Sequence, residues 1–489
     1  MKSLKDSTDA AGSNVVQLEI VDTYNAAWSG PVELALQQSL RYLKGRREVW
    51  LARDAASGQL LVAKCFISGK KQQREFKREV DGLVRLAERS IACPKLLCTA
   101  ADGLGGLWVI TEFIEQSIEL SALLLRRSTN VSSAEMSQAM RSLIKVLFQH
   151  WDSGVYQTDA HLRNFLWAKQ SIYTIDAGSI RFTRGTRSAS WRVRRMAAML
   201  GKSAESFRSR FLQSAFEVCD ELGDFQLLRK LKSARFRTLL AREEAKNLRR
   251  LLKKSQRDCS QYQKTRQGQH TLIYQRQLDP ELISQLKTAP DHLMDLGHRL
   301  KNGNTCTVQQ IEWAGQKIVI KRYNPKPFFY RLRHRFHLSR AMRSWANGIA
   351  LNHLEISTPK PLAIVEEREF GLLKRAYFLM ESCEGQSLSE YLASAINNQE
   401  DTERVIAQLA TIFGRFKDVR AIHGDFKASN ILVDESNLCI IDTDGMKFLV
   451  NRARFQKDFK SDFDRLLSNW EDASPVRHEI KNRLKEIFE

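Results

Sequence analysis

The sequence has little of what marks secreted, metal-binding or membrane-spanning proteins. Its 8 cysteines among 489 residues are scattered, with no CxxC pair and no clustering with histidine. They predict reduced thiols rather than disulfides or a metal centre. No stretch approaches the ~18 apolar residues that cross a bilayer, and residues 1–14 contain no apolar signal-peptide core. We therefore expect a cytoplasmic protein, with any membrane contact being peripheral.

Acidic residues are also outnumbered. The chain has 77 Lys and Arg against 56 Asp and Glu, a formal net charge of +21. This excess predicts an anionic partner, and nucleotide phosphates, a phosphorylated glycolipid and membrane headgroups all remain open. Nucleic acid ranks low because an aromatic-plus-basic stacking motif and a zinc knuckle are absent. With 43% apolar residues, the chain can bury the cores of two or three domains.

Basic residues gather in two regions of the sequence. Residues 184–269 are helical in pattern and contain basic runs at 191–195, 208–210 and 248–254, while residues 323–340 form a basic, aromatic insertion. Such runs are usually the solvated faces of helices. For the runs within residues 184–269, the alternative is a docking surface for an anionic lipid or a phosphorylated sugar.

A motif in the second half of the chain points to phosphoryl transfer. Residues 423–430 have the sequence HGDFKASN and precede the apolar run 431–433, and Asp442 follows a second apolar run. In phosphoryl transferases of this pattern, an Asp such as Asp425 orients a hydroxyl nucleophile. An Asn such as Asn430 and a later Asp such as Asp442 hold metal ions at the triphosphate. An isolated Asp-Gly is usually only a turn, but four polar groups at this spacing predict chemistry.

The same spacing occurs in the first half of the chain. Each of Asp159, Asn164 and Asp176 precedes its counterpart among Asp425, Asn430 and Asp442 by 266 residues. These equal offsets predict a tandem duplication. Residues 260–269 are polar and apolar-poor, which makes them the best domain boundary. We predict a polar segment at 1–25, one domain at 26–262 and another at 263–489.

Both halves also contain a pair of strands that ends in a lysine. The predicted strands 60–64 and 317–321 end in Lys64 and Lys321, where a kinase N-lobe places its phosphate-binding lysine. Residues 72–89 have one apolar helical face. Glu79 on this helix is the expected partner of Lys64, and a solvated Glu is the alternative.

Other segments predict the nucleotide site and its surroundings. The apolar runs 107–114 and 376–381 predict strands that lead into a hinge, with Glu112 and Glu381 as nucleotide-site candidates. Gly303 is a sparse nucleotide-loop candidate, because one glycine is a weaker signal than GxGxxG. Residues 34–43 show helical spacing and predict a helix. Three acidic residues near the C-terminus are expected to be solvated on a helix: Asp458, Asp462 and Asp464.

At these residues the chain resembles the lipopolysaccharide-core and Kdo kinase family, InaA-like relatives of the protein kinases. The resemblance is clearest at 299–470 and is more divergent at about 40–215. It rests on Ile320 to Tyr323, Ser339 to Trp345 with Asn347, Thr358 to Pro361, His423 to Asn430 and Ile441 to Met446. It implies an α+β fold of two tandem bilobal protein-kinase-like domains, each with a small antiparallel-sheet N-lobe carrying a helix and a mainly helical C-lobe.

The resemblance also implies ATP with Mg²⁺ and transfer of the γ-phosphate to a sugar hydroxyl of the lipopolysaccharide inner core. Asp425 would be the catalytic base, Lys427 the γ-phosphate contact and Lys321 the α/β-phosphate contact, with Asn430 and Asp442 as metal ligands. In the first half, the same roles would belong to Asp159, Lys64, Asn164 and Asp176.

The sequence departs from this pattern in three places. The first half has Gln157-Thr158 where the second has His423-Gly424, and His161 where the second has Lys427. No helix Glu is evident near Lys321, since Arg340, Arg343 and Asn347 occupy that stretch. Asp444 replaces the expected Gly and would be an additional metal ligand or a structural carboxylate.

These departures leave several hypotheses open. The first is an ATP-dependent kinase of lipopolysaccharide core, and a protein Ser/Thr kinase is its nearest competitor because the same phosphate machinery serves either hydroxyl. The second is a regulatory pair of pseudokinases, or one active domain held by one inactive domain. A nucleic-acid binder is the third.

Overall fold

The computed structural model describes residues 15–26, 28, 30–43, 45–67, 69–124, 132–158, 160–394, 399–434 and 437–488. By its contacts the chain divides into two compact units. The first consists of residues 1–199 and 206–236, and the second of residues 200–205 and 237–489. Among the described helices, none has the length and apolar character needed to cross a bilayer. Both units are mixed α/β with antiparallel sheets.

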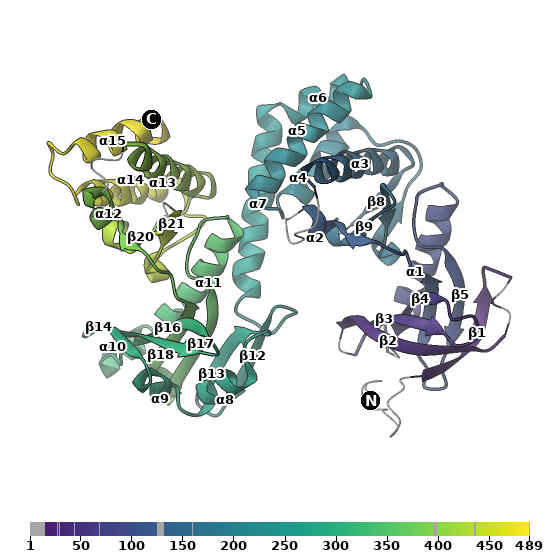
Figure 1. The fold of residues 1–489 in the computed structure, drawn as a ribbon, viewed down its shortest axis with the longest axis horizontal. Coiled ribbons are helices and arrows are strands. Elements are labelled where there is room, and N and C mark those ends of the chain that lie inside the picture. The colour runs from purple at the N-terminus through teal and green to yellow at the C-terminus, as the bar shows by residue number, and fades with distance from the viewer. Residues whose placement is uncertain are drawn as a thin grey trace. The chain divides into compact units, whose positions relative to one another are not determined.

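The first unit begins with six antiparallel strands that close into a barrel in the order β1-β2-β3-β4-β6-β5 (Figure 1). They are β1 (Val15–Thr23), β2 (Val32–Leu43), β3 (Arg47–Asp54), β4 (Leu60–Phe66), β5 (Leu96–Ala101) and β6 (Leu107–Glu112). The barrel closes because β1 pairs with both β2 and β5, which leaves no open sheet edge. Trp50, Trp108 and Leu34 are among the apolar side chains that fill it.

One predicted element is wrong, because residues 34–43 form most of β2 instead of a helix. Val32, Leu34 and Leu36 are buried, whereas Glu33 between them is exposed. This alternation has the period of two that a strand requires. Pairing with β1 and β3 on both sides then decides the structure. Strand β1 lies within the residues 1–25 that sequence analysis set apart as a polar segment.

The remainder of the first unit consists of one helix after the barrel strand β4 and a mainly helical portion. Helix α1 (Gln72–Ala87) contacts the short helix η3 (Ala177–Ser179) through Gly82, where an added Cβ would lie 2.5 Å from the Ala177 carbonyl oxygen. The later elements are β7 (Ile118–Glu119), α2 (Leu120–Leu124), α3 (Ser133–Asp152), β8 (Val155–Gln157), η2 (Leu162–Asn164), β9 (Phe165–Ala168), β10 (Ser171–Thr174), β11 (Ile180–Phe182), α4 (Ala189–Leu200), α5 (Glu205–Glu221) and α6 (Phe225–Leu231).

The second unit is built on a seven-stranded antiparallel sheet in the order β12-β13-β17-β18-β16-β15-β14. The strands are β12 (Tyr262–Gln267), β13 (His270–Gln275), β14 (His298–Asn302), β15 (Cys306–Trp313), β16 (Gln316–Tyr323), β17 (Pro361–Glu369) and β18 (Leu372–Glu381). Ile318 and Ile320 of β16 face a core with α8 (Pro280–Thr288) and α9 (Pro290–Asp295). Tyr323 faces the opposite core, with α11 (Arg340–His353). Because side chains alternate along a strand, Lys321 lies on the α11 face.

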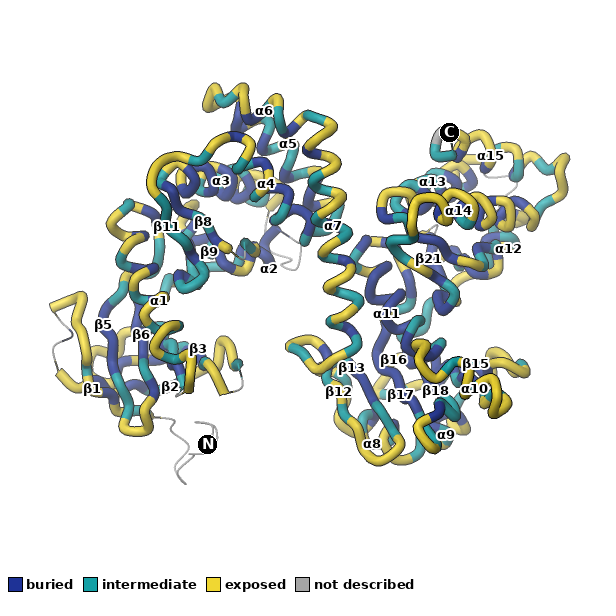
Figure 2. Tube along the Cα trace, turned by 180° about the vertical axis from the view of Figure 1, so that it is seen from behind, coloured by how far each residue is buried: buried dark blue, intermediate teal, exposed yellow. Residues whose placement is uncertain are grey.

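The helical portion of the second unit lies on the other side of α11 from the sheet (Figure 1). It consists of β19 (Gln386–Ser387), α12 (Leu388–Ser394), α13 (Gln399–Val419), η5 (Ala428–Asn430), β20 (Ile431–Asp434), β21 (Asn437–Ile440), η6 (Thr443–Gly445), α14 (Arg452–Leu467) and α15 (Pro475–Phe488). Phe413, Phe426 and Phe459 belong to its core. The buried segments in Figure 2 run through α11 and the central strands, so α11 connects the sheet to the helical portion.

Candidate active site

The HGDFKASN segment lies between α13 and β20 and is held by buried groups. The His423 ring is buried, and its Nε2 lies 3.1 Å from the Ile441 carbonyl oxygen. Burial lowers the pKa of His423, so the ring is neutral. Gly424 has φ +82°, and a Cβ there would also approach the Gly445 carbonyl oxygen at 3.2 Å. The loop before Asp425 is therefore fixed against the strand and turn that carry Asp442.

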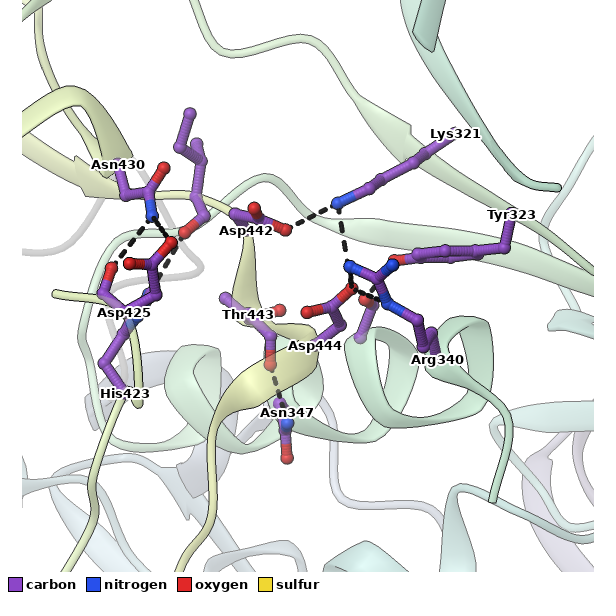
Figure 3. Close-up of polar contacts among 12 residues, drawn as sticks. Lys321, Tyr323, Arg340, Asn347, His423, Asp425, Asn430, Asp442, Thr443 and Asp444 are labelled. Carbon is purple, nitrogen blue, oxygen red and sulfur yellow. Dashed lines mark hydrogen bonds and ion pairs between the residues drawn. The ribbon is translucent and has the colours of Figure 1, made fainter. Parts of the chain in front are cut away.

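Asp425 is contacted by two cations and one amide, and Figure 3 shows the contact with the amide of Asn430. Its Oδ1 lies 2.6 Å from Nε of Arg465, and its Oδ2 lies 3.4 Å from Nζ of Lys427. The Asn430 amide nitrogen donates to the backbone oxygen of Asp425 at 2.9 Å and to its Oδ2 at 3.3 Å. These contacts orient the carboxylate, which is about one-third exposed and accessible to a substrate.

Lys321 and Asp442 come together although they are 121 residues apart. The Lys321 Nζ donates to Asp442 Oδ1 at 2.5 Å and lies 3.9 Å from Asp444 Oδ2. Burial opposes the charged ammonium, but Tyr323 and the two carboxylates outweigh it, so the pKa of Lys321 is raised. Burial likewise opposes the charged Asp442, but Lys321 and Arg340 outweigh it, so its pKa is lowered. Both groups are ionised at neutral pH.

Arg340, at the start of α11, occupies the stretch where sequence analysis found no helix Glu. Its Nε donates to Asp444 Oδ2 at 2.7 Å, and its guanidinium lies 4.9 Å from the ring centre of Tyr323. Asn347, further along α11, donates to the backbone oxygens of Thr443 and Met446 at 2.8 and 3.1 Å. Helix α11 therefore fixes the Asp442 turn through Arg340 and Asn347, and Asp444 forms an ion pair with Arg340 (Figure 3).

The expectation that Asp462 is solvated is wrong. Its side chain is buried and accepts hydrogen bonds from the backbone amides of His423 and Gly424, at 2.6 and 2.9 Å. Burial raises the pKa of Asp462 from 3.8 to about 6, in spite of the hydrogen bonds that it accepts. The sequence does contain a signal for this role, because Asp462 shares the buried face of α14 with Phe459, Phe463 and Leu466.

Sequence reasoning also missed Arg465, one turn beyond Asp462 on α14, which contacts Asp425. It recognised Arg340 only as a replacement for an expected glutamate. For both residues the partner is more than thirty positions away, so no local sequence pattern predicts the pairing. The Asp444 substitution for Gly was the available signal, because a buried carboxylate needs a cation nearby.

The first unit assembles a related site around Lys64. The expected contact is present, since Lys64 Nζ donates to Glu79 on α1, and it lies 3.8 Å from Asp176 Oδ1. Glu79 also accepts from the Gly178 amide at 3.0 Å. Arg47 adds a second cation 3.4 Å from Asp176. Burial opposes ionisation of Asp176, but Lys64 and Arg47 outweigh it, and the pKa is lowered.

The two Asp turns share their backbone geometry. Asp176 and Asp442 both have left-handed backbone, with φ of +59° and +57°. In each unit the residue before this Asp donates its amide to the backbone oxygen of the loop Asn, Asn164 or Asn430, at 2.9 Å. Left-handed backbone is uncommon outside glycine. The two turns therefore share an uncommon conformation at the same Asp.

The other predicted site residues are placed as follows. Asp159 lies outside the described residues. Gly303 lies in the β14–β15 turn, where its amide donates to the Cys306 carbonyl oxygen at 3.0 Å. Glu112 and Glu381 are the last residues of β6 and β18. Their side chains contact the backbone of Lys95 and the ammonium of Lys360, respectively.

The residues at the Asp442 turn suit a magnesium ion that is shared with a nucleotide. Within the described residues, no group of three or more His, Cys, Asp and Glu side chains could hold a metal. Mg²⁺ at phosphoryl-transfer sites, however, takes one or two carboxylates together with substrate phosphates. Asn430 directs its amide nitrogen to Asp425 and its oxygen away from it (Figure 3). Asp442 and the Asn430 side-chain oxygen are therefore suitable protein ligands for Mg²⁺, and substrate phosphates would supply further ligands.

The sequence profile of the lipopolysaccharide kinase (Kdo/WaaP) family matches residues 290–485. These residues form a lipopolysaccharide kinase (Kdo/WaaP) family domain. The match confirms the family resemblance of the second unit and the prediction of a kinase. All matched residues belong to the second unit, and the lipopolysaccharide kinase domain contains Lys321, Asp425, Asn430 and Asp442.

Two solved structures resemble parts of the chain. The first, WaaP in complex with acyl carrier protein, is 18% identical, and the match covers 44% of this chain and 89% of that chain with a TM-score of 0.31. The second, a rhoptry kinase from Toxoplasma gondii, is 12% identical, and the match covers 34% of this chain and 51% of that chain with a TM-score of 0.28. A comparison with curated proteins found no match.

Proposed function

We propose that the lipopolysaccharide kinase domain of the second unit transfers the γ-phosphate of ATP to a hydroxyl of a lipopolysaccharide inner-core sugar. The observation that carries this proposal is the 2.5 Å contact between Lys321 of the sheet and Asp442 of the helical portion. This contact brings together the lysine that we propose to bind phosphate and the carboxylate that we propose to bind a metal ion. Asp425 lies on the neighbouring loop.

The residues of the domain would divide the chemistry among them. Asp425, oriented by Asn430 and Arg465, accepts a hydrogen bond from the acceptor hydroxyl and aligns it for attack. Lys427, beside Asp425, contacts the γ-phosphate, and Lys321 contacts the α- and β-phosphates. Because phosphoryl transfer asks mainly for positioning and for cations where charge accumulates, this arrangement suffices without a covalent intermediate.

Mg²⁺ is the metal we propose, with Asp442 and Asn430 as its protein ligands. When bound, it would neutralise charge on the triphosphate. The ammonium of Lys321 contacts Asp442. We expect Lys321 to transfer this contact to the nucleotide phosphates, which would free the carboxylate.

We further propose that the chain is a tandem duplication at 26–262 and 263–489, in which the first unit does not transfer phosphate. The matching Asp turns, strand lysines and Asn hydrogen bonds of the two units support the duplication. The first catalytic loop supports inactivity, because it has Gln157 in place of His423 and His161 in place of Lys427. The Asp176 carboxylate is also held by two cations, Lys64 and Arg47.

We place the enzyme at the inner face of the cytoplasmic membrane, as a peripheral protein. This location follows from the proposed acceptor and from the net charge of +21. ATP and the glycolipid are the proposed partners.

The acceptor is tested by measuring transfer of labelled γ-phosphate from ATP with purified core oligosaccharide, with a protein substrate and with no acceptor. The proposal expects transfer to the oligosaccharide alone, and transfer that is about 10²–10⁴-fold slower in the Asp425→Asn variant. Phosphorylation of the protein substrate instead would show that the enzyme is a protein Ser/Thr kinase. Nucleotide binding with no transfer to any acceptor would establish a pseudokinase pair.

A further inference from the structure

A strongly basic hollow of about 330 Å³ lies beside the active site of the second unit. Its walls come from the end of β16, from α10 (Phe328–Arg333) and the loop after it, and from the first residues of α11 and β18. Eight Lys and Arg side chains line it, and no Asp or Glu does. Arg340 belongs both to this lining and to the ion pair with Asp444. The hollow therefore suits an anionic group.

Three of the lining cations are available to a ligand. Arg375 and Arg340 are paired with Asp291 and Asp444. In contrast, Lys326, Arg335 and Arg343 form no ion pair with any carboxylate in the described part of the chain. The Arg343 Nε is buried and without a hydrogen-bond acceptor among the described residues. A buried unpaired guanidinium nitrogen is costly, and an anion in the hollow would satisfy it.

Exposed phenylalanines surround the same hollow. Phe370, Phe336 and Phe329 are 94%, 85% and 83% exposed, the three highest values among the large apolar side chains of the described residues. Phe329 lies on α10 and Phe336 on the loop after it. Phe370 lies in the β17–β18 turn, between the lining residues Arg368 and Leu373. Figure 2 shows α10 as exposed. Such a cluster marks an interaction surface.

The position of Phe370 adds an independent observation. Glu369 pairs with Leu372, so Phe370 and Gly371 form a two-residue hairpin turn, with φ of +52° and +76°. Turns of this kind prefer Asn-Gly, because a bulky residue at positive φ is strained. The backbone of Phe370 is strained, yet its side chain contributes to no core, since it is almost fully exposed. Backbone strain of this kind points to function.

We propose that this surface docks on an anionic lipid bilayer, with a headgroup phosphate in the basic hollow and Phe329, Phe336 and Phe370 in the interfacial region. Cations beside exposed aromatic and aliphatic side chains are the combination that binds bilayer surfaces. Leu332 and Leu338 on the same segment are also exposed. Leucine contributes to insertion among acyl chains but not to base stacking, which favours lipid over single-stranded nucleic acid.

The basic runs found in the sequence between residues 184 and 269 fit this role less well. Arg208 is buried, and Arg192 is paired with Asp152. Arg249 and Arg250 on α7 (Ala234–Lys254) are exposed, but no exposed large apolar side chain of the described residues lies on that helix. Charge without an apolar anchor gives weak, salt-sensitive binding. These two arginines therefore provide a matched control.

The inference deepens the proposed function, since it says how the enzyme would reach a membrane-bound acceptor, but its test requires no ATP. The full chain is sedimented with phosphatidylcholine vesicles and with vesicles that also contain phosphatidylglycerol. We expect binding to the anionic vesicles only. The Lys326→Glu/Arg335→Glu variant should lose about tenfold or more in vesicle affinity, because each cation near the surface contributes about fivefold.

The apolar part of the surface is tested separately. Phe329→Ser/Phe336→Ser should weaken binding about tenfold or more, because two phenyl rings no longer enter the interface. Phe370→Asn should weaken it less and leave the turn intact, since Asn tolerates positive φ. The matched controls, Arg249→Glu/Arg250→Glu on α7 and Phe225→Ser on α6, should bind as the wild type does.

Several results would overturn the docking surface. These are wild-type affinity in both double variants, an equal loss in the controls, or equal binding to vesicles without phosphatidylglycerol. Loss of binding to RNA or to an acidic protein, with vesicle binding unchanged, would assign the surface to that partner instead. Transfer to soluble core oligosaccharide should be normal in all these variants. Its absence in the wild type would refute the proposed function while leaving the docking result intact.

Discussion

The two units place their strand lysine between two carboxylates, but they take one of the carboxylates from different elements. Lys64 faces Glu79 of the helix and Asp176 of the turn. Lys321 faces Asp442 and Asp444, both of the turn. The Cβ of an added side chain at Gly178 would lie 2.8 Å from Glu79 Oε2, so Glu79 occupies the space that Asp444 fills in the second unit. The second carboxylate beside the lysine thus comes from a helix in the first unit and from the turn in the second, where the helix supplies a cation, Arg340, instead.

The catalytic loops show a second reversal of charge. In the second unit Asp462 accepts from the amides of His423 and Gly424. In the first unit Arg195 instead donates to the carbonyl oxygens of Gln157 and Thr158. The same loop position is thus fixed by an acid in one unit and by a base in the other. The comparison teaches that a similar loop can be held by side chains of opposite charge, through its carbonyl oxygens in one unit and its amides in the other.

A large difference is expected between removal of the strand lysine of the second unit and removal of that of the first. Lys321→Met should lower kcat/KM for phosphate transfer about 10²–10³-fold, because a cation at the phosphates is lost. Lys64→Met should change it by less than about threefold if only the second unit transfers phosphate. Steady-state kinetics with core oligosaccharide measure both. A comparable loss in the two variants would end the distinction between the units.

A charge exchange tests the reversal directly. Arg340→Glu should lower transfer about 10–100-fold, because it removes the cation nearest to Asp444 and adds a like charge. Adding Asp444→Gly to this variant leaves the carboxylate on the helix and none at this position of the turn, as with Glu79 and Gly178 in the first unit, and should recover most of the loss. A double-mutant cycle on kcat/KM measures the coupling. Simple additivity of the two changes would show that Arg340 and Asp444 do not act as a pair.

Asp462 should give the second unit a characteristic pH dependence. Its pKa is raised from 3.8 to about 6 by burial. Below about pH 6 the carboxyl takes up a proton and loses acceptor capacity toward the loop amides, so transfer should fall. The Asp462→Asn variant should have about tenfold lower kcat and no such acid limb. Asp464→Asn on the exposed side of the same helix is the control.

Stability should respond to the same proton in the opposite direction. The folded protein binds the proton more tightly than the unfolded chain, so this group stabilises the fold on acidification and loses that contribution as pH rises from about 4 to about 6. Thermal unfolding of wild type and Asp462→Asn across this range measures the difference. If the fall in transfer at low pH persists in the Asp462→Asn variant, a group other than Asp462 causes that fall.

The smallest effects concern how each helix contacts its Asp turn. Gly82→Ala should destabilise the first unit by about 1–3 kcal/mol, because the new methyl meets the Ala177 carbonyl oxygen at 2.5 Å. Asn347→Ala should destabilise the second unit by about 1–3 kcal/mol, because two backbone oxygens lose a buried donor. Urea unfolding measures both changes.

Gly414→Ala is the control for these helix substitutions. Gly414 lies within α13, and an added Cβ would meet no atom within 4 Å. The change should therefore stabilise the protein slightly, by about 0.5–1 kcal/mol. Destabilisation by Gly414→Ala as large as by Gly82→Ala would mean that the close helix–turn contact is not the cause.

The elements that could be predicted are those encoded locally. The strand lysines, the helix at 72–87 and the spacing of Asp425, Asn430 and Asp442 depend on short periodic patterns and motifs. The β2 strand was mistaken for a helix because its short apolar pattern fits both periods. Only its two neighbouring strands decide between them.

The parts that could not be predicted depend on contacts between distant segments. Arg340 with Asp444, Arg465 with Asp425, and Asp462 with the loop amides each join residues that no local pattern relates. The closure of the first barrel is of the same kind, since β1 must reach both β2 and β5. The roles of the predicted site residues stay predictions until kinetics test them.

The central claim is that phosphate transfer belongs to the second unit alone, and single-turnover transfer of γ-phosphate to core oligosaccharide tests it most directly. The variants are Asp159→Asn, Asp425→Asn and the two combined. The account predicts wild-type transfer by Asp159→Asn, and a loss of about 10²–10⁴-fold that is the same in Asp425→Asn and in the double variant. Substantial transfer by Asp425→Asn that disappears in the double variant would contradict it.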